Sequence, residues 1–282
     1  MTRLLRVRIL LNHINTIYFL FIKIIPFLIF GFFLGQKKPK LSEYIAKPLI
    51  RYGIPLSVTG LILKEGIDID LIKTAFLAFF IIGFLFLLIN FFPIFKRKLP
   101  NYTFQLAGLI GNTSFLGIPI AIALLPSKTI NFTIGFDLGT TLFAWMFGPI
   151  LLEKKESNNF INLKELLNAL LNSPASRGVL GALAAYLLNL EEKLGNYLWI
   201  PAKIVIFFAI IIVGTKLGII INQKDKIFDL NQDVKYSIML KLFIFPFIIF
   251  SISRFLNFDL NQTSAVVLQA GTPSAISNIL MA

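Results

Sequence analysis

Long apolar runs separated by short polar connections fill almost the whole chain. Nine of them approach or exceed the length of about 20 residues that a membrane-spanning helix needs. They lie at residues 16–35, 45–63, 71–95, 104–125, 129–152, 166–190, 198–221, 234–256 and 262–282. Only helices or closed barrels satisfy the backbone in lipid, and these runs lack the alternation of barrel strands. The pattern therefore predicts an all-α integral membrane protein with nine segments.

The fourth run is interrupted at its middle by residues that are unusual in a membrane helix. Residues 111–119 read Gly-Asn-Thr-Ser-Phe-Leu-Gly-Ile-Pro, so glycines, a proline, an amide and two hydroxyls stand together. Non-helical backbone at membrane depth is tolerated only where it is buried in protein or lines a water-filled cavity. A helix broken at this depth is typical of a transporter binding site.

The ninth run carries a similar interruption. Residues 269–278 read Gln-Ala-Gly-Thr-Pro-Ser-Ala-Ile-Ser-Asn, and a shorter likeness joins residues 53–55 to residues 199–201. Interrupted segments in corresponding positions of two halves are the best sequence pointer to a transporter site. We expect a first membrane repeat at 1–152, a cytoplasmic connection at 153–165 and a second repeat at 166–282. Since five segments precede the connection, the second repeat is expected to be inverted relative to the first.

Composition and charge support a membrane location and exclude several other classes. The chain is 56% hydrophobic and 15% charged, which is more apolar than a soluble core of 282 residues requires. The net charge of +13 comes largely from short loops between apolar runs, so we expect positive-inside topology rather than a nucleic-acid partner. We expect the loops that are richer in Lys and Arg to face the cytoplasm, which puts the N-terminus outside the cell membrane. With no cysteine and one histidine, we expect no metal site, no cofactor and no enzyme activity.

Several stretches resemble motifs of the auxin efflux carrier family of permeases, which includes bacterial malate-type permeases and the plant PIN carriers. Residues 111–119 look like the family's Asn-Thr-Gly-Phe-Leu-Gly-x-Pro signature in the fourth helix. Residues 270–282 are similar to the Ala-x-Met-Pro-[Ser/Thr]-Ala-x-Asn stretch of the ninth helix. Weaker likenesses to the sixth, seventh and eighth helices lie at Ser173-Pro174 with Gly181, at residues 214–218, and at Lys241 with Pro246.

The resemblance implies two inverted five-helix repeats, in which the fourth and ninth helices are broken at prolines and cross at the centre. The chain departs from the family pattern at several positions. Ser114 stands where glycine is usual, Ser173 replaces asparagine, and Thr272 replaces methionine. The family's asparagine after the second proline falls at Ser277, with Asn278 one place later. The family's tenth helix has no counterpart in the sequence, so we expect the second repeat to be incomplete.

Broken helices that cross present groups that suit an organic anion. Backbone N–H groups at a helix N-terminus favour a carboxylate, and C-terminal carbonyls favour a cation or a polar group. The residues expected to bind substrate are Asn112, Thr113, Ser114, Gly117, Pro119, Thr272, Pro273, Ser274 and Asn278. Close helix packing through small residues, with proline as an ordinary kink, is the structural alternative. Gln105 and Gln269 precede the two breaks, and we expect them to contact the substrate-binding residues rather than the substrate itself.

One carboxylate and two lysines are candidates for a coupling charge. Asp137 is the only acidic residue deep in an apolar run, where a carboxylate is costly unless it is paired or hydrated. Lys241 and Lys203 are expected to pair with Asp137 or with an anionic substrate. Alternatively, Asp137 belongs to a structural ion pair or lies nearer the membrane interface. The alternative for the lysines is that their side chains snorkel to the headgroups.

These features predict a permease that moves a small organic anion across the lipid bilayer by alternating access, with a second copy of the chain as a further candidate partner. Two alternatives stay open. A sodium-coupled anion symporter of the bile-acid-transporter type would need a sodium gradient for flux. A membrane sensor or scaffold with a transporter-like fold would bind a ligand without flux.

Overall fold

The structure is a computed structural model that describes residues 24–153, 174–222 and 231–274, together with positions 22, 164, 168 and 171. Within these residues the chain is helical apart from short connections and one isolated antiparallel β-bridge. The predicted all-α class is therefore confirmed for this part of the chain. Most of the predicted connection at 153–165 lies outside the described residues, as does Asn278.

Four described helices are long and apolar enough to cross a membrane, as expected of a membrane-embedded protein. They are α5 (Ile69–Phe91), α9 (Ile130–Glu153), α12 (Glu191–Asn222), and the continuous helix formed by α13 (Gln232–Met239), η4 (Leu240–Ile244) and α14 (Phe245–Phe255). The helix α2 (Ile25–Lys37) is apolar but shorter. The other predicted runs form shorter or interrupted helices in the described part, so the total of nine crossings stays a prediction.

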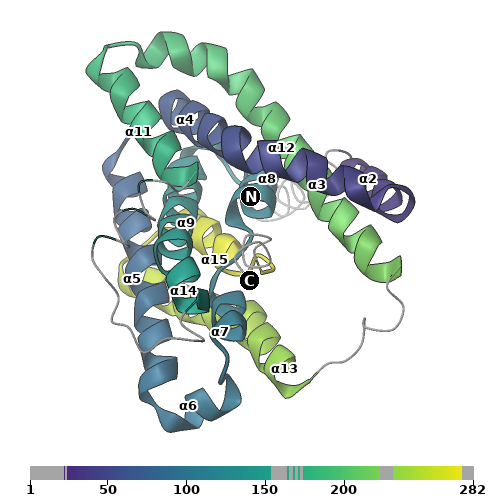
Figure 1. The fold of residues 1–282 in the computed structure, drawn as a ribbon. Coiled ribbons are helices and arrows are strands. Elements are labelled where there is room, and N and C mark those ends of the chain that lie inside the picture. The colour runs from purple at the N-terminus through teal and green to yellow at the C-terminus, as the bar shows by residue number, and fades with distance from the viewer. Residues whose placement is uncertain are drawn as a thin grey trace, which may run out of the picture.

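The helices pack into two groups that contact each other sparsely (Figure 1). The first group places α12 along α2, and also against α3 (Pro39–Pro48), η1 (Leu49–Gly53) and α4 (Ile54–Glu65), with α11 (Pro174–Leu187) on α4. The second group holds the remaining described helices. They are α5, α6 (Pro93–Lys98), α7 (Tyr102–Leu109), η2 (Thr113–Gly117), α8 (Ile118–Leu124), η3 (Ser127–Thr129), α9, α13, η4, α14 and α15 (Leu260–Ala270). Contacts between the groups run mainly from α4 and α11 to α9, and from α12 to η2.

Glycines let α2 and α12 approach until their backbones touch. A Cβ added at Gly31 or Gly35 would collide with the carbonyl oxygen of Ile211 or Thr215. The reverse holds as well, because Gly214 and Gly218 lie against carbonyls of α2. Small residues four apart are the usual means of close helix association in membranes. This reciprocal contact, named here the glycine seam, fixes α2 on α12.

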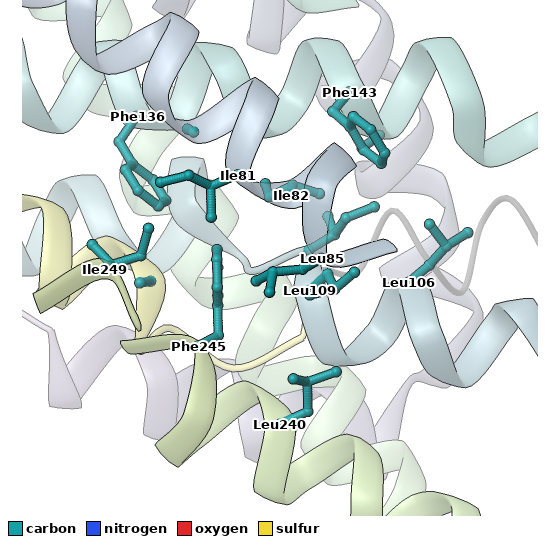
Figure 2. Packing of buried hydrophobic residues seen from close by; sticks show 14 of the residues in the cluster. Ile81, Ile82, Leu85, Leu106, Leu109, Phe136, Phe143, Leu240, Phe245 and Ile249 are labelled. Carbon is teal, nitrogen blue, oxygen red and sulfur yellow. The ribbon is translucent and has the colours of Figure 1, made fainter. Parts of the chain in front are cut away.

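A large apolar cluster forms the core of the second group, and Figure 2 shows part of it. Phe245 of α14 lies beneath Ile81 and Ile82 of α5, with Phe136 of α9 nearby. Leu109, the last residue of α7, belongs to the same cluster. The C-terminal end of α7, where the fourth segment breaks, is therefore held in this apolar core.

A five-residue π turn precedes a proline in three separate segments. The turns η1, η2 and η4 are each followed by an α-helix with proline in its first turn, at Pro55, Pro119 and Pro246. Proline lacks an N–H and its ring clashes with the carbonyl four residues earlier, so the preceding backbone widens to the i→i+5 pattern. Two of these turns, η2 and η4, carry the polar residues of the candidate site.

Candidate functional site

Both interruptions that the sequence predicts are present, and they meet. The helix α7 ends at Leu109, and helical structure resumes at Thr113. The helix α15 ends at Ala270, with non-helical backbone at residues 271–274. Because α7 supplies about 12 Å of rise, the first break falls near the middle of a hydrocarbon core about 30 Å thick. We name residues 110–117 and 269–274 together the crossing.

The two extended stretches pair through their backbones. Gly111 and Ser274 form the isolated antiparallel bridge, and the N–H of Asn112 donates to the carbonyl of Pro273 at 2.7 Å. The hydroxyl of Ser274 donates to the carbonyl of Ala107 at 2.6 Å. Groups that the broken helices leave without intrahelical partners are thus satisfied by the opposite break. Three predicted site residues, Asn112, Pro273 and Ser274, lie at this bridge.

The Lys241 ammonium lies directly against the break of the fourth segment. The side chain projects from η4, is 2% exposed, and donates to the carbonyl of Leu109 at 3.3 Å. A Cβ added at Gly111 would be only 2.8 Å from Lys241 Nζ. The ring of Phe245, 4.7 Å from the ammonium, adds a cation–π contact. In the described part of the chain, no carboxylate lies within ion-pair distance of Lys241.

The Asp137 carboxylate lies at the first turn of η2, among hydroxyl groups. Thr113 and Ser114, the first two residues of η2, both donate to Asp137 Oδ1, at 2.5 Å and 2.6 Å. Thr141, one turn further along α9, is a third hydroxyl partner. The carboxylate is buried, yet neither Lys241 nor Lys203 forms an ion pair with it in the described residues. We name Asp137, Thr113, Ser114 and Thr141 the hydroxyl cluster.

Gln269 places a buried amide at the crossing, and this amide has no hydrogen-bond partner among the described residues. Its side chain is fully buried, and neither Nε2 nor Oε1 has a hydrogen bond among the described residues. The amide lies on Gly117, where an added Cβ would collide with it. Thr272 instead donates its hydroxyl to the backbone carbonyl of Gln269, at 2.8 Å. A buried amide of this kind is costly until a ligand or water satisfies it.

Lys203 lies in the first helix group, on α12. Its ammonium is 4.1 Å from the centre of the Trp199 ring, on the same helix. Burial raises the pKa of Glu65 at the end of α4, and the positive charges of Lys64 and Lys203 oppose that rise. The structure therefore places Lys203 beside Trp199 and Glu65, and its predicted coupling role stays a prediction.

The described part of the crossing unites most of the residues that the sequence predicted for binding. Pro119 lies in the first turn of α8, and Thr272 packs against Gly111. Gln269 was expected only to support the site, and its position about one turn before Pro273 gave no sign that its amide lacks a hydrogen-bond partner among the described residues. No group of three or more His, Cys, Asp or Glu side chains in the described residues is arranged to bind a metal ion. No protein-family model matches the chain, and neither does any curated protein.

Proposed function

We propose that this protein is a membrane transporter that carries a small organic anion by alternating access around the crossing. The observation that supports this function is the Lys241 ammonium, a buried positive charge held at two paired helix breaks. A charge inside a membrane segment is expensive and generally marks a substrate or ion pathway. Kinship with the auxin efflux carriers, inverted repeats and an outside N-terminus in the cell membrane belong to the same proposal.

The chemistry around Lys241 favours an anion over other ligands. Its visible partners are one carbonyl and one aromatic face, which stabilise the ammonium without neutralising it. A substrate carboxylate supplies the missing negative charge and forms a charge-assisted hydrogen bond, which is about twice as strong as a neutral one. The amide of Gln269 offers a further donor and acceptor at the crossing.

Flux measurements in proteoliposomes test this proposal. We expect uptake of at least one of acetate, succinate, malate and indole-3-acetate by the wild-type chain. Lys241→Met should reduce binding of that anion roughly 30-fold or more, since loss of one partner of a buried charge pair costs about 2–5 kcal/mol. Asn112→Ala combined with Pro119→Ala, which disturbs the break itself, should also abolish flux.

Lys73→Met is the matched control. Lys73 is exposed on α5, so this change removes one positive charge from the same helix group away from the crossing. We expect its flux to equal that of the wild type. Binding without flux in the wild type would instead favour the sensor function. Flux unchanged in both Lys241→Met and the Asn112/Pro119 double variant would refute the proposal.

A further inference from the structure

We infer that the hydroxyl cluster is a binding site for one monovalent cation, either a sodium ion or a proton. The site consists of the Asp137 carboxylate and the hydroxyls of Thr113, Ser114 and Thr141. Lys241 is not part of it, because the Lys241 ammonium lies against Gly111 and forms no ion pair with Asp137 in the described residues. Its four side chains come from two elements only, η2 and α9.

The charge of Asp137 requires compensation that the described protein does not supply. Asp137 and Lys241 are the two buried charged side chains among the described residues, and they do not pair. Elements packed against α9 carry charged residues towards their ends. These are Lys64 and Glu65 on α4, Asp70 and Lys73 on α5, Lys128 on η3 (Ser127–Thr129) and Arg177 on α11. Among the described residues, Lys64, Lys73 and Lys128 form no ion pair with Asp137.

The donor set fits a small hard cation. Hydroxyl hydrogens now point at Asp137 Oδ1, and rotation of these groups would turn their oxygen lone pairs towards a bound ion. Carboxylate and hydroxyl oxygens together form the oxygen-only environment that hard cations prefer. A proton satisfies the same charge by making Asp137 neutral, with a hydroxyl oxygen as acceptor. Both ligands neutralise the carboxylate, and the experiment below separates them.

The position of the cluster links this cation to the anion. Thr113 and Ser114 directly follow Asn112, whose N–H holds Pro273 of the opposite break. A cation that fixes the first turn of η2 therefore also fixes the paired backbones next to Lys241. Cation and anion should then strengthen each other's binding by the same factor, as linkage requires. This last step rests on the proposed transport function, whereas the cation site itself does not.

Cation binding is measured first, on the purified full chain in lipid nanodiscs without any anion substrate. We expect saturable binding of radioactive sodium with choline as the balancing ion, or else uptake of one proton per chain during a pH titration. Asp137→Asn should abolish the signal. Ser114→Ala and Thr141→Ala should weaken sodium binding roughly tenfold or more, because each removes one ligand of the ion. If the ligand is a proton, the same changes should instead tighten its binding, because the lost hydroxyls favour the charged carboxylate.

Thr140→Ala is the matched control for Thr141→Ala. The Thr140 hydroxyl donates to the carbonyl of Phe136 within α9, so its loss should leave cation binding unchanged. Sodium binding identifies the metal ion, and proton uptake without sodium binding identifies the proton. The inference fails if the wild type binds neither, or if Asp137→Asn and Ser114→Ala both bind as the wild type does. The milder Ser114→Ala keeps the test decisive if Asp137→Asn does not fold.

The linkage is measured second, with the anion that the flux assay identifies. We expect the affinity for that anion to rise when the cation is present, and the cation affinity to rise by the same factor when the anion is present. Lys241→Met should abolish this enhancement while cation binding by the hydroxyl cluster persists. Cation binding that persists in a chain with no anion flux would refute the transport function but leave the cation site standing. Equal anion affinity with and without the cation would refute the linkage.

Discussion

The crossing stabilises its two buried charges, Lys241 and Asp137, by different means. Neither has a partner of opposite charge among the described residues. Lys241 is held by a carbonyl at the C-terminal end of α7, where the helix dipole favours a cation. Asp137 is held by hydroxyl donors, which favour the charged form of a carboxylate. The two charged groups form no ion pair in the described residues, so they do not neutralise each other directly. Each is therefore available to a ligand of opposite sign.

Gln269 provides a test of whether the crossing is built for a ligand rather than for stability. Its amide is buried without a hydrogen-bond partner among the described residues, which costs about 1–3 kcal/mol of folding free energy. Gln269→Leu removes the polar atoms at similar volume, so we expect the ligand-free protein to gain about that much stability. Anion binding should weaken in the same variant. Unfolding followed by the fluorescence of the two tryptophans measures the first effect, and equilibrium binding measures the second.

Gln105→Leu is the control for this prediction because its amide is satisfied. Gln105 accepts from Asn90 at 2.7 Å and donates to the carbonyl of Leu99 at 2.8 Å. Its loss leaves those partners unpaired, so we expect lower stability. A Gln269→Leu protein that is as destabilised as Gln105→Leu would show that the Gln269 amide has a structural role.

Sequence reasoning found the charged residues of the site but not their contacts. Asp137 and Lys241 could be predicted because a charge inside an apolar run is visible without a structure. That they form no ion pair could not be predicted, because it depends on how α9 and η4 pack around the break. Gln269 could be placed near the break, yet its missing hydrogen bonds follow from the approach of Gly117, which only the packing reveals.

At the scale of helices, the sequence predicted some structural effects of glycine and proline and missed others. The broken segments were predicted because their glycines and prolines stand at the middle of apolar runs. The π turns before Pro55 and Pro246 were not, since these prolines widen the helix without breaking it. The glycine seam was also missed, because glycines spaced four apart acquire meaning only when the partner helix is known.

The glycine seam carries the next prediction. Gly31→Ala and Gly214→Ala each add a Cβ where a backbone carbonyl of the facing helix already lies. The helices must separate along their whole contact, so we expect a loss of about 1–3 kcal/mol, the usual cost of overpacking. Unfolding of the purified protein, followed by tryptophan fluorescence, measures this loss.

Gly83→Ala separates the effect of the seam from a general effect of alanine. A Cβ at Gly83 would meet only the edge of the Phe143 ring, at 3.3 Å, so a shift of that ring by a few tenths of an ångström would relieve the contact. Alanine also favours a helix more than glycine does. We therefore expect Gly83→Ala to be neutral or stabilising. A Gly31→Ala protein as stable as Gly83→Ala would mean that α2 and α12 do not touch through their backbones.

Across the whole molecule, the sparse contact between the two helix groups is the feature most relevant to transport. A cavity of about 490 Å³ lies between them, lined by apolar residues of α4 and α11 on one side and of α5 and α9 on the other. Such a cavity forfeits the dispersion contacts that would hold the groups together. The crossing belongs to the second group, while the glycine seam makes the first group rigid. We therefore expect the two groups to move relative to each other more easily than the helices within either group do.

Cross-linking across the cavity tests whether that movement accompanies flux. The chain has no cysteine, so a pair introduced at Leu142 of α9 and Leu183 of α11, which both line the cavity, is uniquely addressed. A bifunctional thiol reagent that spans the cavity should lower flux to background, and a cleavable version should restore flux after reduction. The control pair replaces Phe27 and Phe207, whose rings lie 4.8 Å apart within the first group. We expect cross-linking there to leave flux unchanged. If the pair across the cavity can be linked without loss of flux, the two groups do not need to move, and alternating access must arise from rearrangement within the crossing itself.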